Sequence, residues 1–187
     1  SDITFDIKEN KIDIHHSRSE PWKITVVDTG EHSMTGGRLA RVKDFIKNDN
    51  EFCFTYGDGL SNINIKELIM FHRSHQKLAT VSATFPPGRF GALEIENEKV
   101  NKFIEKPMGD GQMINGGFFV LSPKVIDLIE DDSTVWEKTP LETLAKNGEL
   151  MAYKHKDFWQ PMDTLRDKNY LEDLWNSGKA PWKIWDK

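Results

Sequence analysis

The chain has 187 residues, the length of one ordinary domain, and its 30 acidic and 25 basic side chains give a formal net charge of −5 at pH 7. This charge excludes a general binder of polyanions, although a local basic pocket is compatible with it. No apolar run approaches the roughly 20 residues of a membrane-spanning helix, and the first residues do not read as a signal peptide. The single cysteine, Cys53, excludes an internal disulfide and favours the reducing cytoplasm.

The first half of the chain alternates between strand and helix patterns. Apolar residues at every second position indicate strands, and apolar residues three or four apart indicate helices. The expected elements are a hairpin over 3–14, a strand over 24–27, a helix over 37–47, a strand over 52–56, a helix over 64–74 and a strand over 78–85. The strand over 52–56 is nearly all apolar, which is typical of a strand buried on both faces of a parallel sheet, and Cys53 is expected in the core.

The second half of the chain continues this alternation. The expected elements are a hairpin over 91–104, a strand over 116–121, a helix opened by Ser122 and Pro123, a helix with a capping box at 139–142, a strand over 149–154 and a helix over 163–176. Strands and helices that alternate in this way predict an α/β fold with a mixed sheet.

Asp58 lies between two glycines directly after the strand over 52–56. In open α/β sheets, ligands bind beyond the carboxyl ends of the strands, and glycines allow a ligand to approach closely. One carboxylate together with substrate phosphates is a usual way to hold Mg²⁺. Because Gly and Asp are also common turn residues, the pattern leaves a magnesium site and a plain turn as alternatives.

Asp163 stands just before the last helix. Its carboxylate either caps that helix, by accepting from the backbone of Leu165 or Arg166, or serves as a second metal ligand. The residue pattern by itself favours the cap.

Three glycine-bearing or charged segments are further candidates. The segment 33–38 precedes a helix, so its backbone N–H groups and Arg38 suit an anionic ligand or the edge of a base. The segment 105–107 offers a lysine for a phosphate and a glutamate for sugar hydroxyls, or forms an ordinary charged turn. The glycine pair at 116–117 indicates a ligand that presses on the backbone, and the stiff loop 86–91 is suited to wall a pocket.

The histidines are interpreted as structural or surface residues. His72 and His75 share one helix face, but no Cys or carboxylate completes a tetrahedral zinc site beside them. Cys53 has no His or Asn partner pattern that would mark it as a nucleophile.

Six motifs follow one another along nearly the whole chain. They are Ser-Met-Thr-Gly-Gly-Arg at 33–38, Tyr-Gly-Asp-Gly at 56–59, Phe-Pro-Pro-Gly-Arg-Phe-Gly-Ala-Leu at 85–93, Glu-Lys-Pro at 105–107, Met-Ile-Asn-Gly-Gly-Phe-Phe-Val at 113–120 and Phe-Trp-Gln-Pro-Met-Asp-Thr at 158–164. Together they closely resemble the sugar-phosphate nucleotidylyltransferase family, and the last two are similar to its cytidylyltransferase branch. Each motif by itself is modest, but six in this order are specific.

The resemblance implies a Rossmann-like, three-layer mixed sheet of the nucleotidyltransferase (GT-A-like) type, with 1–187 as the C-terminal major part of a single domain. It implies the reaction of CTP with α-D-glucose 1-phosphate to give CDP-glucose and pyrophosphate, a step towards the dideoxyhexoses of bacterial surface polysaccharide (O-antigen). It also implies Mg²⁺ as cofactor, small-molecule substrates, a homo-oligomer, and no nucleic-acid or membrane partner.

The resemblance assigns roles to individual residues. It makes Asp58 and Asp163 the ligands of Mg²⁺ and pairs Lys106 with the sugar phosphate, so these three are the expected catalytic residues. The expected nucleotide contacts are Ser33, Thr35, Gly36, Arg38, Gly57 and Asp58. The expected sugar-phosphate contacts are Gly91, Glu105, Lys106, Asn115 and Gly116.

One departure from the family is large. Its members open with a strand and a loop of the type Gly-Gly-x-Gly-Thr-Arg that wraps the triphosphate, whereas the Gly-Gly pairs of this chain stand at 36–37 and 116–117. Because the chain also begins with Ser rather than Met, we expect it to be part of a longer protein and to be inactive alone. The alternatives are the same chemistry with UTP or dTTP, a metal-dependent glycosyltransferase, and a non-catalytic sugar-nucleotide-binding module.

Overall fold

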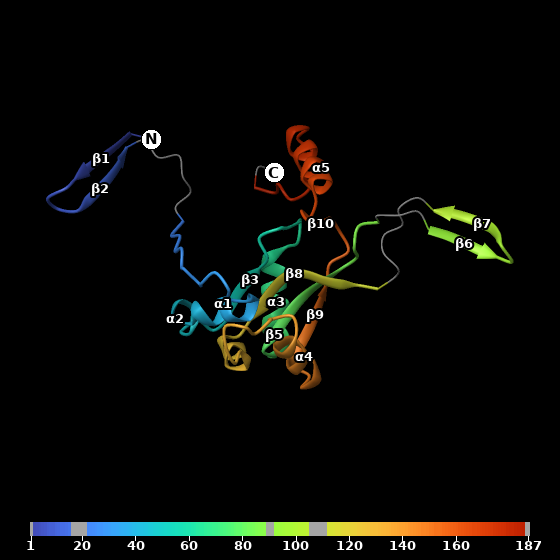
Figure 1. The fold of residues 1–187 in the computed structure, drawn as a ribbon, viewed down its shortest axis with the longest axis horizontal. Helices are drawn as coiled ribbons and strands as arrows, with labels where there is room; N and C mark the ends of the chain where they lie inside the picture. The colour runs from blue at the N-terminus through green and yellow to red at the C-terminus, as the bar shows by residue number, and fades with distance from the viewer. Residues whose placement is uncertain (1, 16–21, 89–91, 105–111, 186–187) are drawn as a thin grey trace.

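The computed structural model describes residues 2–15, 22–88, 92–104 and 112–185. Along the chain lie β1 (Asp2–Asp6), β2 (Lys11–His15), α1 (Thr35–Arg41), α2 (Lys43–Ile46), β3 (Phe52–Thr55), β4 (Gly59–Ser61), α3 (Ile65–His75), β5 (Ala79–Thr84), β6 (Ala92–Glu96), β7 (Lys99–Ile104), β8 (Ile114–Leu121), the 3₁₀ helix η1 (Pro123–Leu128), α4 (Thr139–Lys146), β9 (Leu150–Lys154), β10 (Trp159–Pro161) and α5 (Leu165–Asn176). Figure 1 shows a central body from which one β-hairpin extends on each side.

Four strands form the main sheet in the order β3-β8-β5-β9 (Figure 1). The strand β8 lies between β3 and β5 and is antiparallel to both, whereas β9 is parallel to β5. The strands β3 and β5 therefore run in the same direction, with α3 between them in the chain, as in the expected βαβ unit. The mixed sheet with its helices confirms the predicted α/β class.

Both faces of the sheet are covered, because successive side chains of β8 point to opposite faces. Phe119 and Leu121 belong to one core cluster, together with Leu39, Ala79, Val125, Ile126, Trp136 and Leu144. Val120 belongs to a second cluster with Ile63 and Leu68. Burying a side chain of this size contributes about 1.5–3 kcal/mol, so the two clusters hold helices against each face and give the three layers expected.

The helix α3 covers the second of these clusters and has clear signals at both ends. The side chain of Asn64 accepts hydrogen bonds from two amides of the first turn, which caps the helix. Gln76 takes the left-handed conformation, with φ 56°, and ends it. Leu68 and His72, one turn apart, are its buried residues. In the part of the chain that the structure describes, no helix is long and apolar enough to cross a membrane.

The strand β3 differs from its prediction. It pairs with β8 alone and is an edge strand of the described sheet, rather than a strand buried on both faces of a parallel sheet. Phe52 and Phe54 are half-buried, while Cys53 and Thr55 between and after them are exposed. The prediction of a core cysteine is therefore wrong, because apolar residues at every position of an edge strand cannot all be covered.

Three further expectations on secondary structure are wrong. The strand expected over 24–27 does not form, and Val26 there is 92% exposed, because no described strand pairs with this segment. The helix expected over 37–47 is divided at Val42 into α1 and α2. The capping box expected at the start of α4 is absent, since the cap residue Lys138 makes no side-chain cap hydrogen bond.

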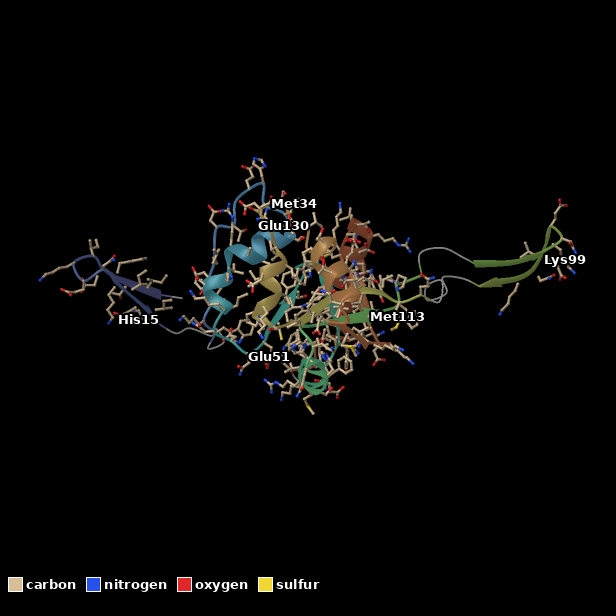
Figure 2. The ribbon with its side chains drawn as sticks, turned by 90° about the horizontal axis from the view of Figure 1, so that it is seen from below. His15, Met34, Glu51, Lys99, Met113 and Glu130 are labelled. Carbon is tan, nitrogen blue, oxygen red and sulfur yellow. The ribbon has the colours of Figure 1, made fainter. Side chains whose placement is uncertain are left out.

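The two predicted hairpins are confirmed and lie at opposite ends of the molecule, as His15 of β2 and Lys99 of β7 mark in Figure 2. In the first hairpin Phe5 is paired with Ile12, and both side chains are more than half exposed. The hairpin of β6 and β7 interrupts the chain between β5 and β8.

A separate small sheet joins β4 to β10, and neither strand is predicted by the sequence patterns. The two strands are antiparallel, with Gly59 opposite Pro161. The strand β4 directly follows Asp58, and β10 ends just before Met162 and Asp163, so this small sheet decides where the two candidate aspartates lie.

Candidate functional site

The pairing of β4 with β10 brings Asp58 and Asp163 to the same place in the fold. Beyond the pair of Gly59 and Pro161, the backbone N–H of Met162 donates a 2.8 Å hydrogen bond to the carbonyl oxygen of Asp58. Asp163 follows Met162 directly, and the side chains of both aspartates are exposed. Two aspartates that are far apart in the sequence therefore lie at the same end of the β4–β10 ladder.

The start of α5 removes the alternative interpretation of Asp163 as a helix cap. The cap residue is Thr164, whose hydroxyl oxygen accepts from the backbone N–H of Asp167 at 3.2 Å. The carboxylate of Asp167 accepts in return from the backbone N–H of Thr164 at 3.0 Å, which completes a capping box. Because Thr164 and Asp167 supply the cap, Asp163 is not needed for it.

The neighbouring aspartates fit the requirements of Mg²⁺. This ion binds oxygen ligands, usually one or two carboxylates together with waters and substrate phosphates. Residues that the structure describes form no group of three or more His, Cys, Asp or Glu side chains able to hold a metal ion, so they do not build a closed site of the zinc type. A Cβ atom on the exposed Gly57 would meet nothing within 4 Å, which leaves open space beside Asp58.

Thr35, predicted to contact the nucleotide, belongs to a hydrogen-bonded group with two residues that the sequence reasoning did not assign. Its hydroxyl donates to Oε2 of Glu137 at 2.7 Å, and the hydroxyl of Tyr56 donates to Oε1 of the same carboxylate at 2.5 Å. Burial, followed by the hydrogen bond to Glu137, raises the pKa of Tyr56 well above its ordinary value. Tyr56 precedes Gly57 and Asp58 directly, so this group connects the start of α1 to the candidate magnesium site.

Gly36 and Gly37 are buried against the loop that precedes α4, instead of facing an open site. The backbone N–H groups of both residues donate to the carbonyl oxygen of Thr134, at 2.9 and 3.3 Å. A Cβ atom on Gly36 would lie 2.6 Å from that oxygen, and one on Gly37 would overlap the backbone of Asp132. The prediction that these amides hold an anion is not supported, because the protein's own carbonyl already uses them.

Ser33 and Arg38, two other predicted nucleotide contacts, flank this buried contact. Ser33 is buried, with 7% of its surface exposed. The guanidinium of Arg38 is exposed and donates to the hydroxyl of Thr29 at 2.8 Å and to the carbonyl oxygen of Glu31 at 3.2 Å. Arg38 is thus held by the preceding loop, close to the start of α1.

Asn115 and Gly116, predicted to contact the sugar phosphate, lie at the start of β8 beside Tyr56. The amide of Asn115 donates to the hydroxyl of Tyr56 at 3.4 Å, and its Oδ1 accepts from the backbone N–H of Gly117 at 2.8 Å. A Cβ atom on Gly116 would lie 2.7 Å from Oγ of Ser82. Close packing against Ser82 therefore also favours a glycine here, which the sequence had attributed to a ligand.

A cavity of about 490 Å³ opens beside Thr164, the residue after Asp163, between the loop that follows β5 and the first turns of α5. It is lined by Pro87, Gly88, Gln160, Thr164, Arg166, Asp167 and Tyr170. The loop was predicted to wall a pocket, but Arg166 and Tyr170 were not assigned. Their spacing of four positions on one helix was the signal available in the sequence, because such residues share a face.

Three predicted site residues, Gly91, Glu105 and Lys106, lie outside the residues that the structure describes. The structure brings together Asp58 with Asp163, and Thr35 with Asn115 through Glu137 and Tyr56.

Known proteins are similar to this chain over most of its length. Residues 3–172 match the family model described as nucleotidyl transferase. The chain belongs to the nucleotidyl transferase family. It is 63% identical over 186 residues to the glucose-1-phosphate cytidylyltransferases of Salmonella typhi and of Salmonella typhimurium, covering all of this chain and 72% of each relative.

Solved structures support the same fold at lower similarity. One of UDP-glucose pyrophosphorylase complexed with UDP-glucose aligns with a TM-score of 0.59 at 14% identity, covering 81% of this chain and 65% of that one. The family membership confirms the predicted nucleotidyltransferase class, and the relatives extend beyond the matched part.

Proposed function

We propose that this nucleotidyl transferase chain serves the transfer of a cytidylyl group from CTP to α-D-glucose 1-phosphate, giving CDP-glucose and pyrophosphate. The proposal rests on one observation above all, the hydrogen bond from Met162 to Asp58, which brings Asp58 and the residue after Met162, Asp163, to the same end of the small sheet. The names of the Salmonella relatives support the choice of CTP and glucose 1-phosphate.

In this reaction a phosphate oxygen of the sugar phosphate attacks the α-phosphorus of CTP, and the bond to the β-phosphate breaks, so that pyrophosphate leaves. No covalent intermediate with the protein is required, and catalysis consists of positioning two anions and stabilising their charge. Asp58 and Asp163 hold the Mg²⁺ ion, which neutralises phosphate charge when it is bound. The family resemblance assigns the pairing with the sugar phosphate to Lys106, which lies outside the described residues.

The cavity beside Asp163 is the place we propose for the hexose phosphate. Arg166 lines it and contributes a planar set of donors that matches phosphate or sugar oxygens. Tyr170 lines the same cavity and supplies an aromatic face with a hydroxyl group. The buried Gln160 forms part of its floor and is held by its hydrogen bond to Asp167 at 3.1 Å.

The nucleotide is proposed to lie along Tyr56 and Thr35, and Asn115, predicted to contact the sugar phosphate, lies beside Tyr56. These residues share one hydrogen-bonded group through Glu137, whose carboxylate accepts from both Thr35 and Tyr56. That group fixes which lone pairs and protons face the nucleotide, so it is a means of choosing among bases. CTP is our choice, and UTP and dTTP are the alternatives that the test must separate.

The test measures pyrophosphate release by the chain alone and by the chain joined to the part of the Salmonella typhi enzyme that lies outside the matched residues. We expect turnover of CTP with glucose 1-phosphate by the joined protein, and none by the 187 residues alone. UTP and dTTP in place of CTP test the choice of base. Release of the sugar from CDP-glucose without pyrophosphate exchange would favour a glycosyltransferase, and substrate binding without turnover by the joined protein would favour a binding module.

The remaining parts of the proposal concern the cellular setting. CDP-glucose would supply dideoxyhexoses for surface polysaccharide, and the reaction would take place in the cytoplasm, where nucleoside triphosphates are made. A homo-oligomer stays a prediction, for which the exposed apolar residues of the first hairpin offer a contact surface.

A further inference from the structure

Two histidines that the proposed reaction does not use are joined to one buried threonine. Nδ1 of His72 and Nε2 of His75, both on α3, lie 2.9 and 2.7 Å from the hydroxyl oxygen of Thr80 on β5. The backbone N–H of Lys77 donates to Nδ1 of His75 at 2.9 Å. Thr80 is fully buried, and His72 is 6% exposed. These contacts fasten the C-terminal turn of α3 to the centre of the sheet.

The direction of every hydrogen bond in this group follows from its first donor. A backbone amide can only donate, so Nδ1 of His75 accepts, and a neutral His75 must carry its proton on Nε2. His75 therefore donates to the oxygen of Thr80. Because the hydroxyl of Thr80 contacts no other acceptor among the described residues, its single proton is directed to Nδ1 of His72, which leaves the proton of a neutral His72 on Nε2. The hydrogen bonds therefore run from Lys77 to His75, from His75 to Thr80 and from Thr80 to His72.

We infer that this hydrogen-bonded chain, which we call the histidine latch (His72, His75, Lys77 and Thr80), is an acid-sensitive fastening that holds the end of α3 on β5 only while both imidazoles are neutral. A proton added to His75 must enter at Nδ1, where it faces the amide hydrogen of Lys77. A proton added to His72 must also enter at Nδ1, so the hydroxyl of Thr80 has to turn its hydrogen away and loses its acceptor. In either case a donor that is partly or fully buried loses its acceptor.

The charged groups around the latch offset these added charges only in part. The ring centroids of His72 and His75 are 5.2 Å apart, so two imidazolium ions would repel each other. Arg73 of α3 and Lys77 add positive charge, while Glu51 before β3 and Glu149 before β9 are the neighbouring carboxylates.

Each of those carboxylates already has a cationic partner. Glu51 accepts from Nε of Arg73 at 2.8 Å, and Glu149 accepts from Nζ of Lys77 at 3.1 Å. On its remaining side His75 contacts the ring of Phe71, which in turn packs on Tyr153 of β9. Burial is the main cause that lowers the pKa values of both His72 and His75, and the positive neighbours lower them further.

The sign of the effect follows from these lowered pKa values. An unfolded histidine takes up its proton near pH 6.5, whereas the folded latch resists protonation. Stability from the latch is thus fully present above about pH 6.5 and is lost as the pH falls below that value. Because α3 covers the core cluster around Leu68, the loosening would begin at the helix end that the latch holds.

Nitrogen-15 NMR of the imidazoles in the 187-residue chain at pH 7.5 tests the direction of the hydrogen bonds. We expect both His72 and His75 as the tautomer with the proton on Nε2. A proton on Nδ1 of His75 at this pH would overturn the inference. This measurement uses the unsubstituted chain, so it does not depend on whether a variant folds.

Urea unfolding between pH 7.5 and 5 tests the acid sensitivity. As the pH falls, the unfolding equilibrium constant should rise by up to about tenfold per pH unit for each histidine of the latch. The double variant His72→Gln and His75→Gln should lose this dependence, while the exposed His32→Gln should keep it. An equal pH dependence in the double variant and the unchanged chain would contradict the inference.

A pair of substitutions at Thr80 separates the hydroxyl from the shape of the side chain. Thr80→Ser keeps the hydroxyl and should retain the single tautomer of His72, while Thr80→Val removes the proton that His72 receives and should give a mixture of tautomers. Identical imidazole spectra for the two variants would count against the latch. None of these readings depends on catalysis, so they hold or fail independently of the proposed reaction.

Discussion

The backbone N–H of Met162 donates to the carbonyl oxygen of Asp58 across 2.8 Å, so Asp163 is seated beside Asp58 by the main chain itself. Main-chain pairing of this kind does not depend on the aspartate side chains. The carboxylates can therefore be changed without disturbing what positions them, which makes their chemical role separable from their structural one.

Asp58→Asn is expected to lower the rate of Mg²⁺-dependent pyrophosphate release by at least about 100-fold, because removing one preorganised electrostatic contact typically lowers kcat by this factor or more. Its exposed side chain predicts little change in urea stability. The joined protein described above is the one to assay, and Asp157→Asn, an exposed aspartate in the loop before β10, is the matched control. Full activity with unchanged metal dependence in Asp58→Asn would make this residue a turn residue only.

Thr164→Ala should destabilise the protein by about 1 kcal/mol, because it removes the hydroxyl that caps α5. Asp163→Asn should change the free energy of unfolding much less, since it does not belong to the capping box. Urea unfolding of both variants measures the difference. The reverse order would return Asp163 to the role of a helix cap.

Arg166→Ala is expected to raise KM for glucose 1-phosphate about tenfold while KM for CTP stays within about twofold, because Arg166 lines the cavity beside Asp163. Steady-state kinetics with each substrate varied in turn measures both values. Lys168→Ala on the same helix is the control, since Lys168 pairs with Glu172 instead. A rise in KM for CTP alone would move the nucleotide, rather than the hexose phosphate, to this cavity.

Gly37→Ala should cost about 1–3 kcal/mol of stability, because its Cβ atom would overlap the backbone of Asp132 and backbone yields less easily than a side-chain end. Gly57→Ala is the matched control for thermal unfolding, since nothing lies within 4 Å of a Cβ atom there. Equal stability of the two variants would mean that the contact of α1 with the 132–134 loop is looser than the structure has it.

The sequence predicted most of the body of the fold, and the elements it missed are short. Leu78 to Phe85 alternates between apolar and polar residues and the residues around Phe119 are nearly all apolar, so β5 and β8 could be predicted. The strands β4 and β10 have three residues each, which is too short for any alternation to be recognised. They position Asp58 and Asp163, so residue patterns alone left these aspartates undecided and the family resemblance was needed.

Local sequence patterns could not predict the contacts that explain the glycines. Gly36 is packed against Thr134, and Tyr56 bonds to Glu137, which is 81 positions away in the chain. A pattern of neighbouring residues carries no information on such contacts, and close packing and ligand approach both select glycine. The histidine latch is more local, since His75 and Thr80 are five positions apart, and its directions came from a single backbone amide.

The most direct test of the central claim is a double-mutant cycle on Asp58 and Asp163 in Mg²⁺-dependent pyrophosphate release from CTP and glucose 1-phosphate by the joined protein. If the two carboxylates hold one ion, removing either abolishes most of its effect, and the double variant should be no more than about threefold worse than the poorer single variant. Losses that multiply, or a single variant that retains full activity, would contradict a shared magnesium site.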